Sequence, residues 1–392
     1  MKKSLFSIML VPVMAVASCG TPVPSAPGSL TSHSQSFAYR LFDDVVSNDS
    51  SDLVFISPLS ASMALSLTAA GANGTTQQAM LDALGFDSAS VKELNEYNRS
   101  VLDYLNNDTS VVLNAANSIW ASDDFVLNTG FCKDASVYYD AKVANLDFSD
   151  PASSSIINQW CSENTAGRID KIIDGIDPNI RMYLLNAIYF KGLWAVPFNP
   201  DFSEEGIFHG DRADTQVKFM HQTGHSFPCY FGSEVSMLEL PYGDGTFVMD
   251  IYLPAEGLSV DEVAARLDEF STVADSLHTP DRLRVTLPAF KAEYDISLNS
   301  ALQRLGMGEA FTASADFSGM SKEPLMIGEV KQKAFIEVNE EGSEAAAVTS
   351  VAVMRASLNP EPVRFTVDRP FVFLIRERIS GTVLFMGLVR NL

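Results

Sequence analysis

Two histidines four residues apart, His221 and His225, are the first candidates for chemistry in this chain of 392 residues. On a helix that spacing would place both imidazoles on one face, where they could bind a metal ion. The intervening Gln-Thr-Gly and the following Ser-Phe-Pro favour a loop or a strand instead, so we expect no metal site. Cys229 follows His225 closely, but a thiol beside an aromatic residue and a proline, with no basic neighbour, has no evident activation.

The common hydrolase and nucleotide-binding motifs are missing from the sequence. It contains no G-x-S-x-G, no H-E-x-x-H and no G-x-x-x-x-G-K-[ST]. The remaining nucleophiles are scattered and form no constellation, so a hydrolase is the weakest of the functions considered. We therefore expect a protein that is not an enzyme and that needs no cofactor.

A different chemistry is indicated for residues 340–360, EEGSEAAAVTSVAVMRASLNP, which follow a strand-like run at 333–339. The β-branched residues favour an extended chain, whereas the acidic, glycine-containing start is typical of a loop. Read with period two, one alternate set is small or β-branched and uncharged, as the core face of a strand requires: Ser343, Ala345, Ala347, Thr349, Val351 and Val353. The pattern indicates a loop that can become a strand, although composition alone also fits a flexible surface loop.

This stretch resembles the reactive-centre loop of the serpins, a family of protease inhibitors. Its opening closely matches the hinge of inhibitory members: Glu340, Glu341, Gly342, Ser343, Glu344, Ala345, Ala346 and Ala347. Other stretches also resemble family motifs: Phe55-Ile-Ser-Pro-Leu-Ser, Asn186-Ala-Ile-Tyr-Phe-Lys-Gly-Leu-Trp, Arg369-Pro-Phe-Val-Phe-Leu-Ile-Arg and Leu384-Phe-Met-Gly-Leu-Val-Arg-Asn. The resemblance covers about Ser34 to Leu392.

The resemblance implies an irreversible suicide-substrate inhibitor of serine proteases, and also of papain-like cysteine proteases. A protease attacks the loop and forms an acyl-enzyme, and the cleaved loop then inserts into the largest sheet as a new strand. The alternative is a non-inhibitory serpin that acts as a binding protein. The inward set carries no charged, bulky or proline residue from Ser343 to Val353, which favours the inhibitor.

The resemblance also implies where the loop is cut. In similar serpins the residue that gives up its carbonyl lies sixteen positions after the one matching Glu340, which places the reactive bond at Ala356–Ser357. A small residue there suits elastase-like proteases. Cleavage after Arg355 would suit trypsin-like proteases, and cleavage after Met354 a larger apolar pocket, so both bonds stay as alternates.

Four further residues resemble serpin positions where the main sheet opens. Ser57, Asn186 and Gln332 match polar residues beneath the separating strands, and Trp194 matches a residue where the loop enters. Many serpins have a histidine at the position of Gln332, so a pH-sensitive opening is in doubt here. For all four, ordinary buried hydrogen bonding or core packing is a competing interpretation.

The N-terminus has the pattern of an export signal. Lys2 and Lys3 precede an apolar run, and Val16-Ala-Ser-Cys19 resembles a bacterial lipobox. We expect a lipoprotein signal peptide at 1–18, lipid on Cys19, a flexible tether at 19–36 and the serpin domain at 37–392. The mature protein would be an exported bacterial lipoprotein of the outer membrane or cell surface, bound to the membrane through its lipid only.

Composition restricts the partners. A net charge of −22 argues against nucleic acid or an anionic membrane surface as a partner and keeps the protein soluble, and we expect a monomer. The three remaining cysteines, Cys132, Cys161 and Cys229, are an odd number without C-x-x-C, which favours free thiols over a disulfide or zinc.

Hydrophobic periodicity predicts a helix-rich first half and a strand-rich second half, hence the α+β class. We expect Thr75-x-x-Gln78 to cap a helix. Further helices are expected at about 58–70, 91–105, 156–166, 260–267 and 295–305, and strands at 111–120, 181–190, 247–253, 282–290, 371–375 and 383–389. The resemblance adds a single domain in which the helices pack on three β-sheets and the reactive-centre loop at 340–360 is exposed.

Overall fold

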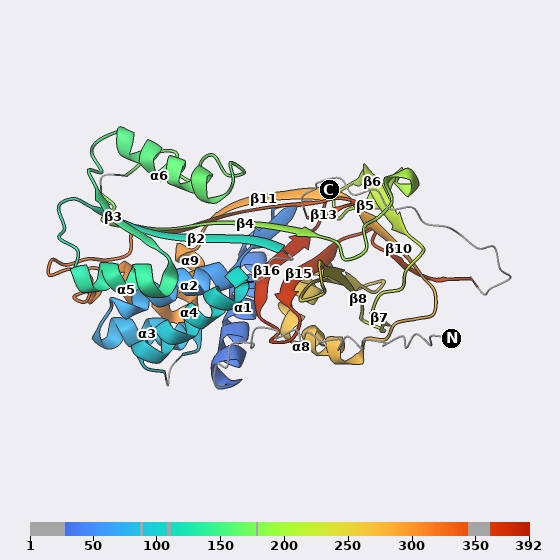
Figure 1. Ribbon diagram of the computed structural model, residues 1–392, viewed down its shortest axis with the longest axis horizontal. Helices are drawn as coiled ribbons and strands as arrows, with labels where there is room; N and C mark the ends of the chain where they lie inside the picture. The colour runs from blue at the N-terminus through green and yellow to red at the C-terminus, as the bar shows by residue number, and fades with distance from the viewer. Residues whose placement is uncertain (1–27, 87–88, 108–110, 178, 344–360) are drawn as a thin grey trace, which may run out of the picture.

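The computed structural model describes residues 28–86, 89–107, 111–177, 179–343 and 361–392. They form a single α+β domain in which helices pack on three sheets (Figure 1). Most of the larger helices lie at one end of the molecule and the smallest sheet lies at the opposite end (Figure 1). Within the described residues no helix is long and apolar enough to cross a membrane.

The main sheet has six strands in the order β11-β12-β13-β4-β2-β3. Their bounds are β2 (Val111–Ser122), β3 (Lys142–Leu146), β4 (Met182–Leu193), β11 (Phe290–Ser297), β12 (Glu329–Val338) and β13 (Gly342–Ser343). β4 lies in the middle of this sheet and its first nine residues are buried. Its near-continuous apolar sequence is explained by the burial of both faces of the strand.

The second sheet also has six strands and contains much of the core. Its order is β1-β16-β15-β9-β8-β7, with β1 (Leu53–Ile56), β7 (Cys229–Phe231), β8 (Val235–Tyr242), β9 (Phe247–Pro254), β15 (Phe371–Glu377) and β16 (Val383–Val389). The third sheet has four strands, in the order β14-β10-β6-β5, with β5 (Glu204–His209), β6 (Asp214–Gln222), β10 (Leu283–Pro288) and β14 (Val363–Thr366).

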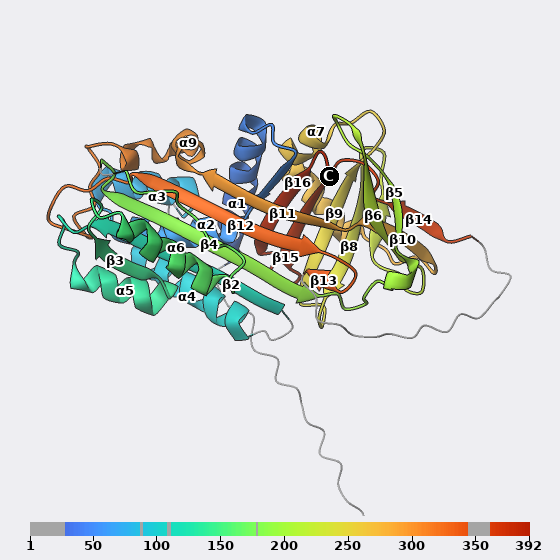
Figure 2. The same ribbon diagram turned by 90° about the horizontal axis from the view of Figure 1, so that it is seen from above.

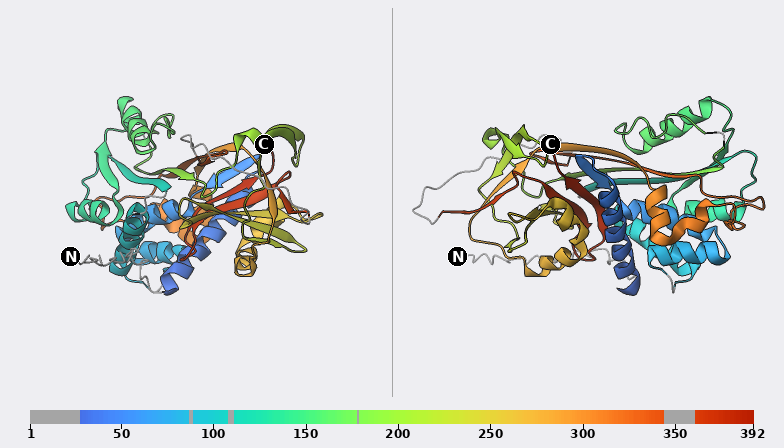
Figure 3. Two further views of the ribbon diagram at one scale, coloured as in Figure 1. Left: turned by 45° about the vertical axis from the view of Figure 1, so that its right-hand side comes forward. Right: turned by 180° about the vertical axis from the view of Figure 1, so that it is seen from behind.

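The helices of the described residues are α1 (Gly28–Asn48), α2 (Pro58–Ala70), α3 (Gly74–Leu84), α4 (Val91–Asn107), α5 (Thr129–Tyr139), α6 (Ala152–Asn164), α7 (Val260–Ala265), α8 (Leu267–Ser271) and α9 (Asn299–Leu302). In Figure 1 and in both views of Figure 3, α6 lies on the opposite side of the main sheet from α2 and α4. α2 is buried all round, which its small and apolar residues permit. Ser57 caps it and Pro58 occupies its first turn, as a favourable helix start requires.

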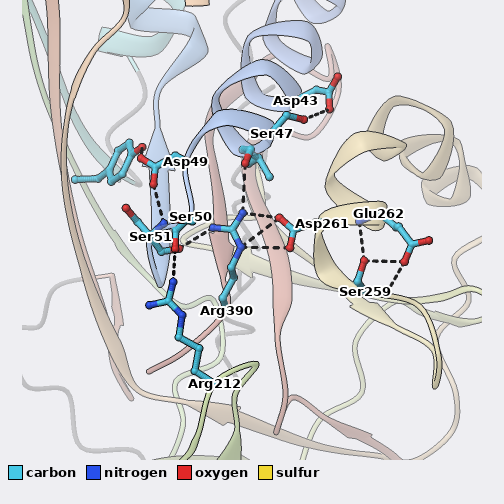
Figure 4. A network of polar contacts seen from close by, with 12 residues as sticks. Asp43, Ser47, Asp49, Ser50, Ser51, Arg212, Ser259, Asp261, Glu262 and Arg390 are labelled. Carbon is cyan, nitrogen blue, oxygen red and sulfur yellow. Dashed lines mark hydrogen bonds and ion pairs between the residues drawn. The ribbon is translucent and has the colours of Figure 1, made fainter.

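The C-terminal segment is fixed by Arg390, whose guanidinium is largely buried (Figure 4). It donates to the carboxylate of Asp261 at the start of α7, and to the carbonyl oxygen of Ser51 at 2.7 Å. Arg212, between β5 and β6, donates to the carbonyl oxygen of Ser50 at 2.6 Å in the same network. These bonds hold together segments from four distant parts of the chain.

Four expectations about the elements differ from the structure. α1 begins at Gly28, so a helix occupies much of the tether expected at 19–36. α3 begins at Gly74 without a side-chain cap, and the Thr75 hydroxyl donates to Glu309 instead of closing a capping box. Residues 295–297 belong to β11, and the helix there starts only at Asn299. A single strand expected at 282–290 is two strands, β10 and the start of β11.

Candidate functional site

The site lies where β4 and β12 meet in the main sheet (Figure 2). These two strands pair in parallel from Glu329 opposite Tyr183 to Phe335 opposite Tyr189. Beyond that point β13 lies between them and pairs antiparallel with each, with Ser343 opposite both Val338 and Gly192. The first residues of the predicted loop therefore already occupy the position of an additional central strand.

A tight turn joins β12 to β13. The N–H of Asn339 donates to the carbonyl oxygen of Gly342 at 2.9 Å, and the N–H of Gly342 donates back at 3.3 Å. Gly342 has a φ of 151°, and a Cβ there would lie 2.1 Å from the carbonyl oxygen of Gly192. No other residue type fits this close approach to β4 without movement of the backbone.

Ser343 faces the interior, as the period-two pattern predicts. Its side chain is fully buried and its hydroxyl lies 2.8 Å from that of Tyr242 on β8. The Tyr242 ring stacks on Trp194, with centroids 4.5 Å apart and 12° between the planes. Burial raises the pKa of Tyr242, partly offset by the Ser343 hydrogen bond, so the phenol stays protonated.

The residues before Gly342 are held by the segment that follows β4. The indole N–H of Trp194 donates to the carbonyl oxygen of Asn339 at 2.9 Å, and the backbone N–H of Phe198 donates to that of Glu340 at 2.8 Å. The Glu340 carboxylate pairs with Lys218 of β6 and accepts a hydrogen bond from Ser203 at 2.7 Å. The main sheet and the third sheet are thus joined through Glu340.

The charge on Glu340 is stabilised by these contacts. Partial burial opposes ionisation, but the hydrogen bonds and charge of Lys218 and Ser203 outweigh it and lower the pKa of Glu340. Glu341 makes a backbone contact with Trp194, at 2.9 Å between the Trp194 nitrogen and the Glu341 carbonyl oxygen. The start of the hinge is therefore anchored at several backbone and side-chain positions.

A second part of the site is a buried polar cluster further along the β4–β12 pair. The Ser57 N–H donates to Gln332 Oε1 at 2.8 Å, and Gln332 Nε2 donates to the Ser57 carbonyl oxygen at 2.9 Å. Gln332 Nε2 also donates to Asn186 Oδ1 at 2.8 Å. Gln332 and Asn186 are register partners on β12 and β4, so separating these strands must break their hydrogen bond.

Sequence reasoning named Ser57, Asn186 and Gln332 together, and the structure brings them into contact. It places Trp194 elsewhere, just past the end of β4 and about 26 Å from Asn186 along the strand direction, where it contacts the hinge. Glu344, Ala345, Ala346, Ala347, Met354, Arg355, Ala356, Ser357 and Cys19 lie outside the described residues.

Several contacting residues were missed: Ser60, Asn117, Ser203, Lys218 and Tyr242. Ser60 and Asn117 both accept hydrogen bonds from Asn186. Ser60 follows Ser57 by one turn of α2, and Asn117 is one of several polar residues in the strand expected at 111–120, so both carried a weak signal. Lys218 and Tyr242 come from the other two sheets and Ser203 from the residue just before β5, and these three carried none.

The histidines and cysteines considered above as metal ligands or nucleophiles lie apart from this site. His221 lies on β6 and its Nδ1 is 3.0 Å from the Thr286 hydroxyl, whereas His225 lies in the following loop, so the pair does not share a helix. Cys229 pairs through its backbone with His278, and burial raises the pKa of its thiol. Cys132, Cys161 and Cys229 are free, and no group of three or more potential metal ligands occurs within the described residues.

Comparison with known proteins identifies this arrangement. A family model described as "Serpin (serine protease inhibitor)" matches residues 32–392. Iripin-2 from Ixodes ricinus is 33% identical over 373 residues, which cover 93% of this chain and 94% of that protein. Leukocyte elastase inhibitor from Sus scrofa is 34% identical over 368 residues, covering 90% and 96%.

Solved structures give the same result. Tengpin, a thermophilic serpin in its native state, superposes with a TM-score of 0.86 at 33% identity, over 95% of this chain and 96% of that one. Human thyroxine-binding globulin, solved with its hormone, has a TM-score of 0.84 at 26% identity, over 92% and 98%. The chain therefore belongs to the serpin family, whose description is that of protease inhibitors and not of enzymes.

Proposed function

We propose that this chain is an irreversible suicide-substrate inhibitor of serine proteases. The observation that carries the proposal is β13, because Gly342 and Ser343 already lie between β4 and β12 and pair antiparallel with both. A loop cut beyond Ser343 needs only to continue along this path. About 13 further residues at ~3.3 Å each would carry the acyl-linked protease ~40 Å.

Trapping follows from competition between insertion and hydrolysis. The protease attacks the loop as a substrate and forms a covalent acyl-enzyme through its nucleophile. If insertion displaces the protease before water reaches the acyl bond, the enzyme stays attached and inactive. The energy comes from the native fold, in which β4 and β12 pair directly with each other and the more stable arrangement, with a strand between them, is reached only after the chain is cut.

The preferred reactive bond is Ala356–Ser357, which suits elastase-like proteases first and trypsin-like proteases second, through Arg355. Similarity to a leukocyte elastase inhibitor supports this order. Papain-like cysteine proteases, which also form acyl-enzymes, are a further target class. The net charge of −22 supports a protein that acts on proteases and not on nucleic acid, and we propose that it acts as a monomer.

The test is incubation of the protein with a panel of serine and cysteine proteases, followed by denaturing electrophoresis. We expect a band that survives SDS, and mass spectrometry of the released C-terminal fragment should show a start at Ser357. A start at Ala356 would make trypsin-like enzymes the main target. Cleavage of the loop without any stable band would reject the inhibitor.

A binding protein is the second candidate, because the fold is also similar to that of thyroxine-binding globulin, solved with its hormone. Loop cleavage without trapping, together with a saturable small-molecule ligand, would support it.

We also propose that the mature protein is a bacterial lipoprotein, anchored through Cys19 at the outer membrane or cell surface. The basic start, the apolar run and the Val16-Ala-Ser-Cys19 sequence support this. Cys19→Ala should release the protein from membranes in the producing cell, and retention of that variant would contradict the proposal.

A further inference from the structure

The turn between β15 and β16 exposes one aliphatic side chain at its tip. Ile379 is 75% exposed, more than any other large hydrophobic residue among those that the structure describes. A single exposed aliphatic residue is common on protein surfaces and by itself indicates nothing. Two further features make this one informative: the turn is rigid, and it lies beside the N-terminal helix.

The turn is held by the carboxylate of Glu377, which is fully buried. Its Oε1 accepts from the backbone N–H of Ile379 at 3.0 Å and from the hydroxyl of Tyr104 at 3.2 Å, and its Oε2 accepts from the backbone N–H of Ser380. The N–H of Glu377 also donates to the carbonyl oxygen of Thr382 at 2.9 Å. Folding Ile379 back onto the body would break bonds to a buried charge, so the side chain is presented outward in a fixed position.

The same turn lies against α1. Gln35 Nε2 donates to the carbonyl oxygen of Ser380 at 3.2 Å, and a Cβ on Gly381 would lie 2.5 Å from that nitrogen. Gln35 follows Gly28, the first residue of α1, by about 10 Å of helix. Ile379 is therefore presented close to the N-terminal end of α1.

Only a short chain separates this end of α1 from the proposed lipid. Residues 20–27 lie between Cys19 and Gly28. Even fully extended, the chain from Cys19 to Gly28 would span about 30 Å at ~3.4 Å per residue. A connection of this length keeps the turn near any membrane that holds the lipid, at an effective concentration of the order of millimolar.

We propose that the turn at 378–382 is a second membrane contact, in which Ile379 enters the surface of a bilayer rich in zwitterionic phospholipid. This inference rests on the proposed lipid anchor. Arg378 Nη2 pairs with Glu239 at 3.0 Å, but the side chain is 49% exposed, so part of it stays accessible to a lipid phosphate. The net charge of −22 opposes an anionic surface and therefore selects a neutral one.

A second contact changes what the anchor does. Lipid on Cys19 holds the chain at its N-terminus only, whereas lipid together with Ile379 holds the folded body as well, and two weak signals bind a membrane more firmly than one. The turn belongs to the second sheet. β14, which follows the reactive-centre loop, belongs to the third sheet at the other end of the molecule from the larger helices (Figure 1). The contact therefore leaves β14 free to face a protease.

A tryptophan at the tip of the turn reports the contact. Lipidated Ile379→Trp protein is reconstituted on phosphatidylcholine vesicles, with or without bromine on the acyl chains, which quenches tryptophan only inside the bilayer. Val126→Trp is the matched control, since Val126 is 73% exposed but follows β2 of the main sheet. We expect brominated lipid to lower the emission added by Ile379→Trp at least about twofold and to leave that added by Val126→Trp unchanged.

Equal quenching of the two variants, or none for Ile379→Trp, would overturn the proposal. Protection of Ile379→Trp from acrylamide in the water phase, without quenching by brominated lipid, would also overturn it, because a protein or a second copy of the chain would then cover the turn. Brominated phosphatidylglycerol should quench Ile379→Trp less than brominated phosphatidylcholine, and the reverse order would contradict the choice of a neutral surface.

A second way of tethering separates this proposal from the lipid anchor. A hexahistidine in place of Cys19 holds the protein on nickel-chelating lipid through the same residues 20–27 without lipidation. Quenching in this form, in a protein that the cell does not lipidate, would leave the contact standing while the anchor fails. If Cys19→Ala releases the protein from membranes but neither tethered form shows quenching, the contact fails while the anchor stands.

Discussion

The hydroxyl of Ser343 lies 2.8 Å from the hydroxyl of Tyr242, and both side chains are fully buried. One residue comes from the hinge and the other from the second sheet, so the first inward position of the loop is already in its inserted place. The next inward positions would follow at intervals of two residues.

Ser343→Arg should convert the proposed inhibitor into a substrate. A guanidinium at this position would be buried without an anionic partner, at a cost of several kcal/mol. We expect the loop still to be cut, with loss of the SDS-stable band on denaturing gels. Tyr242→Phe removes the same hydrogen bond without adding charge and should retain most trapping. Trapping by Ser343→Arg at the wild-type ratio would show that burial of this side chain does not control insertion of the loop.

Gly342→Ala should impair the hinge, because the added Cβ would meet the carbonyl oxygen of Gly192 and φ is positive. We expect a loss of the order of 2 kcal/mol in unfolding free energy and more inhibitor consumed per protease trapped. Gly245→Ala is the matched control, since Gly245 also has positive φ but nothing lies within 4 Å of its Cβ position. If both substitutions change stability and trapping equally, Gly342 is required only for its positive φ and not for its close approach to Gly192.

Gln332→Leu should destabilise the native protein by about 3 kcal/mol, since it removes the partners of the Ser57 backbone and of Asn186. Denaturant unfolding measures this change. Gln216→Leu on β6 makes the same substitution at an exposed site and should have little effect. A variant as stable as the wild type would mean that the strands can separate without loss of these bonds.

The Lys218–Glu340 ion pair should make stability depend on pH. The pKa of Glu340 is lowered in the folded state, so the pair stabilises the fold above the unfolded pKa and this contribution is lost as pH falls through the folded pKa. Melting temperatures of wild type and Lys218→Met should differ at pH 7 and converge near pH 3. Lys92→Met, which removes an exposed pair with Glu96, serves as control. A difference that stays constant with pH would argue against this pair as the cause.

Cleavage in the loop should raise the melting temperature. The inserted segment adds a ladder on each side and buries its apolar alternate residues, at about 25 cal/mol per Å². Calorimetry before and after nicking near Ala356 measures the change. An unchanged or lower melting temperature would contradict insertion, whereas nicking the exposed turn near Asp244 should not raise it.

The sequence predicted those features that depend on local pattern. Period-two alternation placed Ser343 inward, and apolar runs located β4, β12 and β16 within a few residues. The helical spacing over 295–305 was misleading, because Ser297 still pairs with Lys331 and the strand therefore continues past the expected helix start. Thr75 does not cap its helix, because its hydroxyl donates a hydrogen bond to Glu309, which is far away in sequence.

The contacts that anchor the hinge could not be read from local pattern. Lys218 and Tyr242 are an ordinary surface residue and an ordinary core residue of their strands, and Ser203 lies just before β5. Only the packing of one sheet on another brings them to Glu340 and Ser343.

The two pairings of β12 also compete while the protein folds. β12 reaches β13 through a turn of three residues, whereas Gln332 and Asn186 are separated by 146 positions along the chain. Nearby segments meet faster than distant ones, so the hairpin can form first and extend before β4 arrives. A newly synthesised chain that extends the hairpin too far would close off its own reactive loop. The yield of active molecules should therefore depend on how quickly the first half of the chain is in place when β12 emerges.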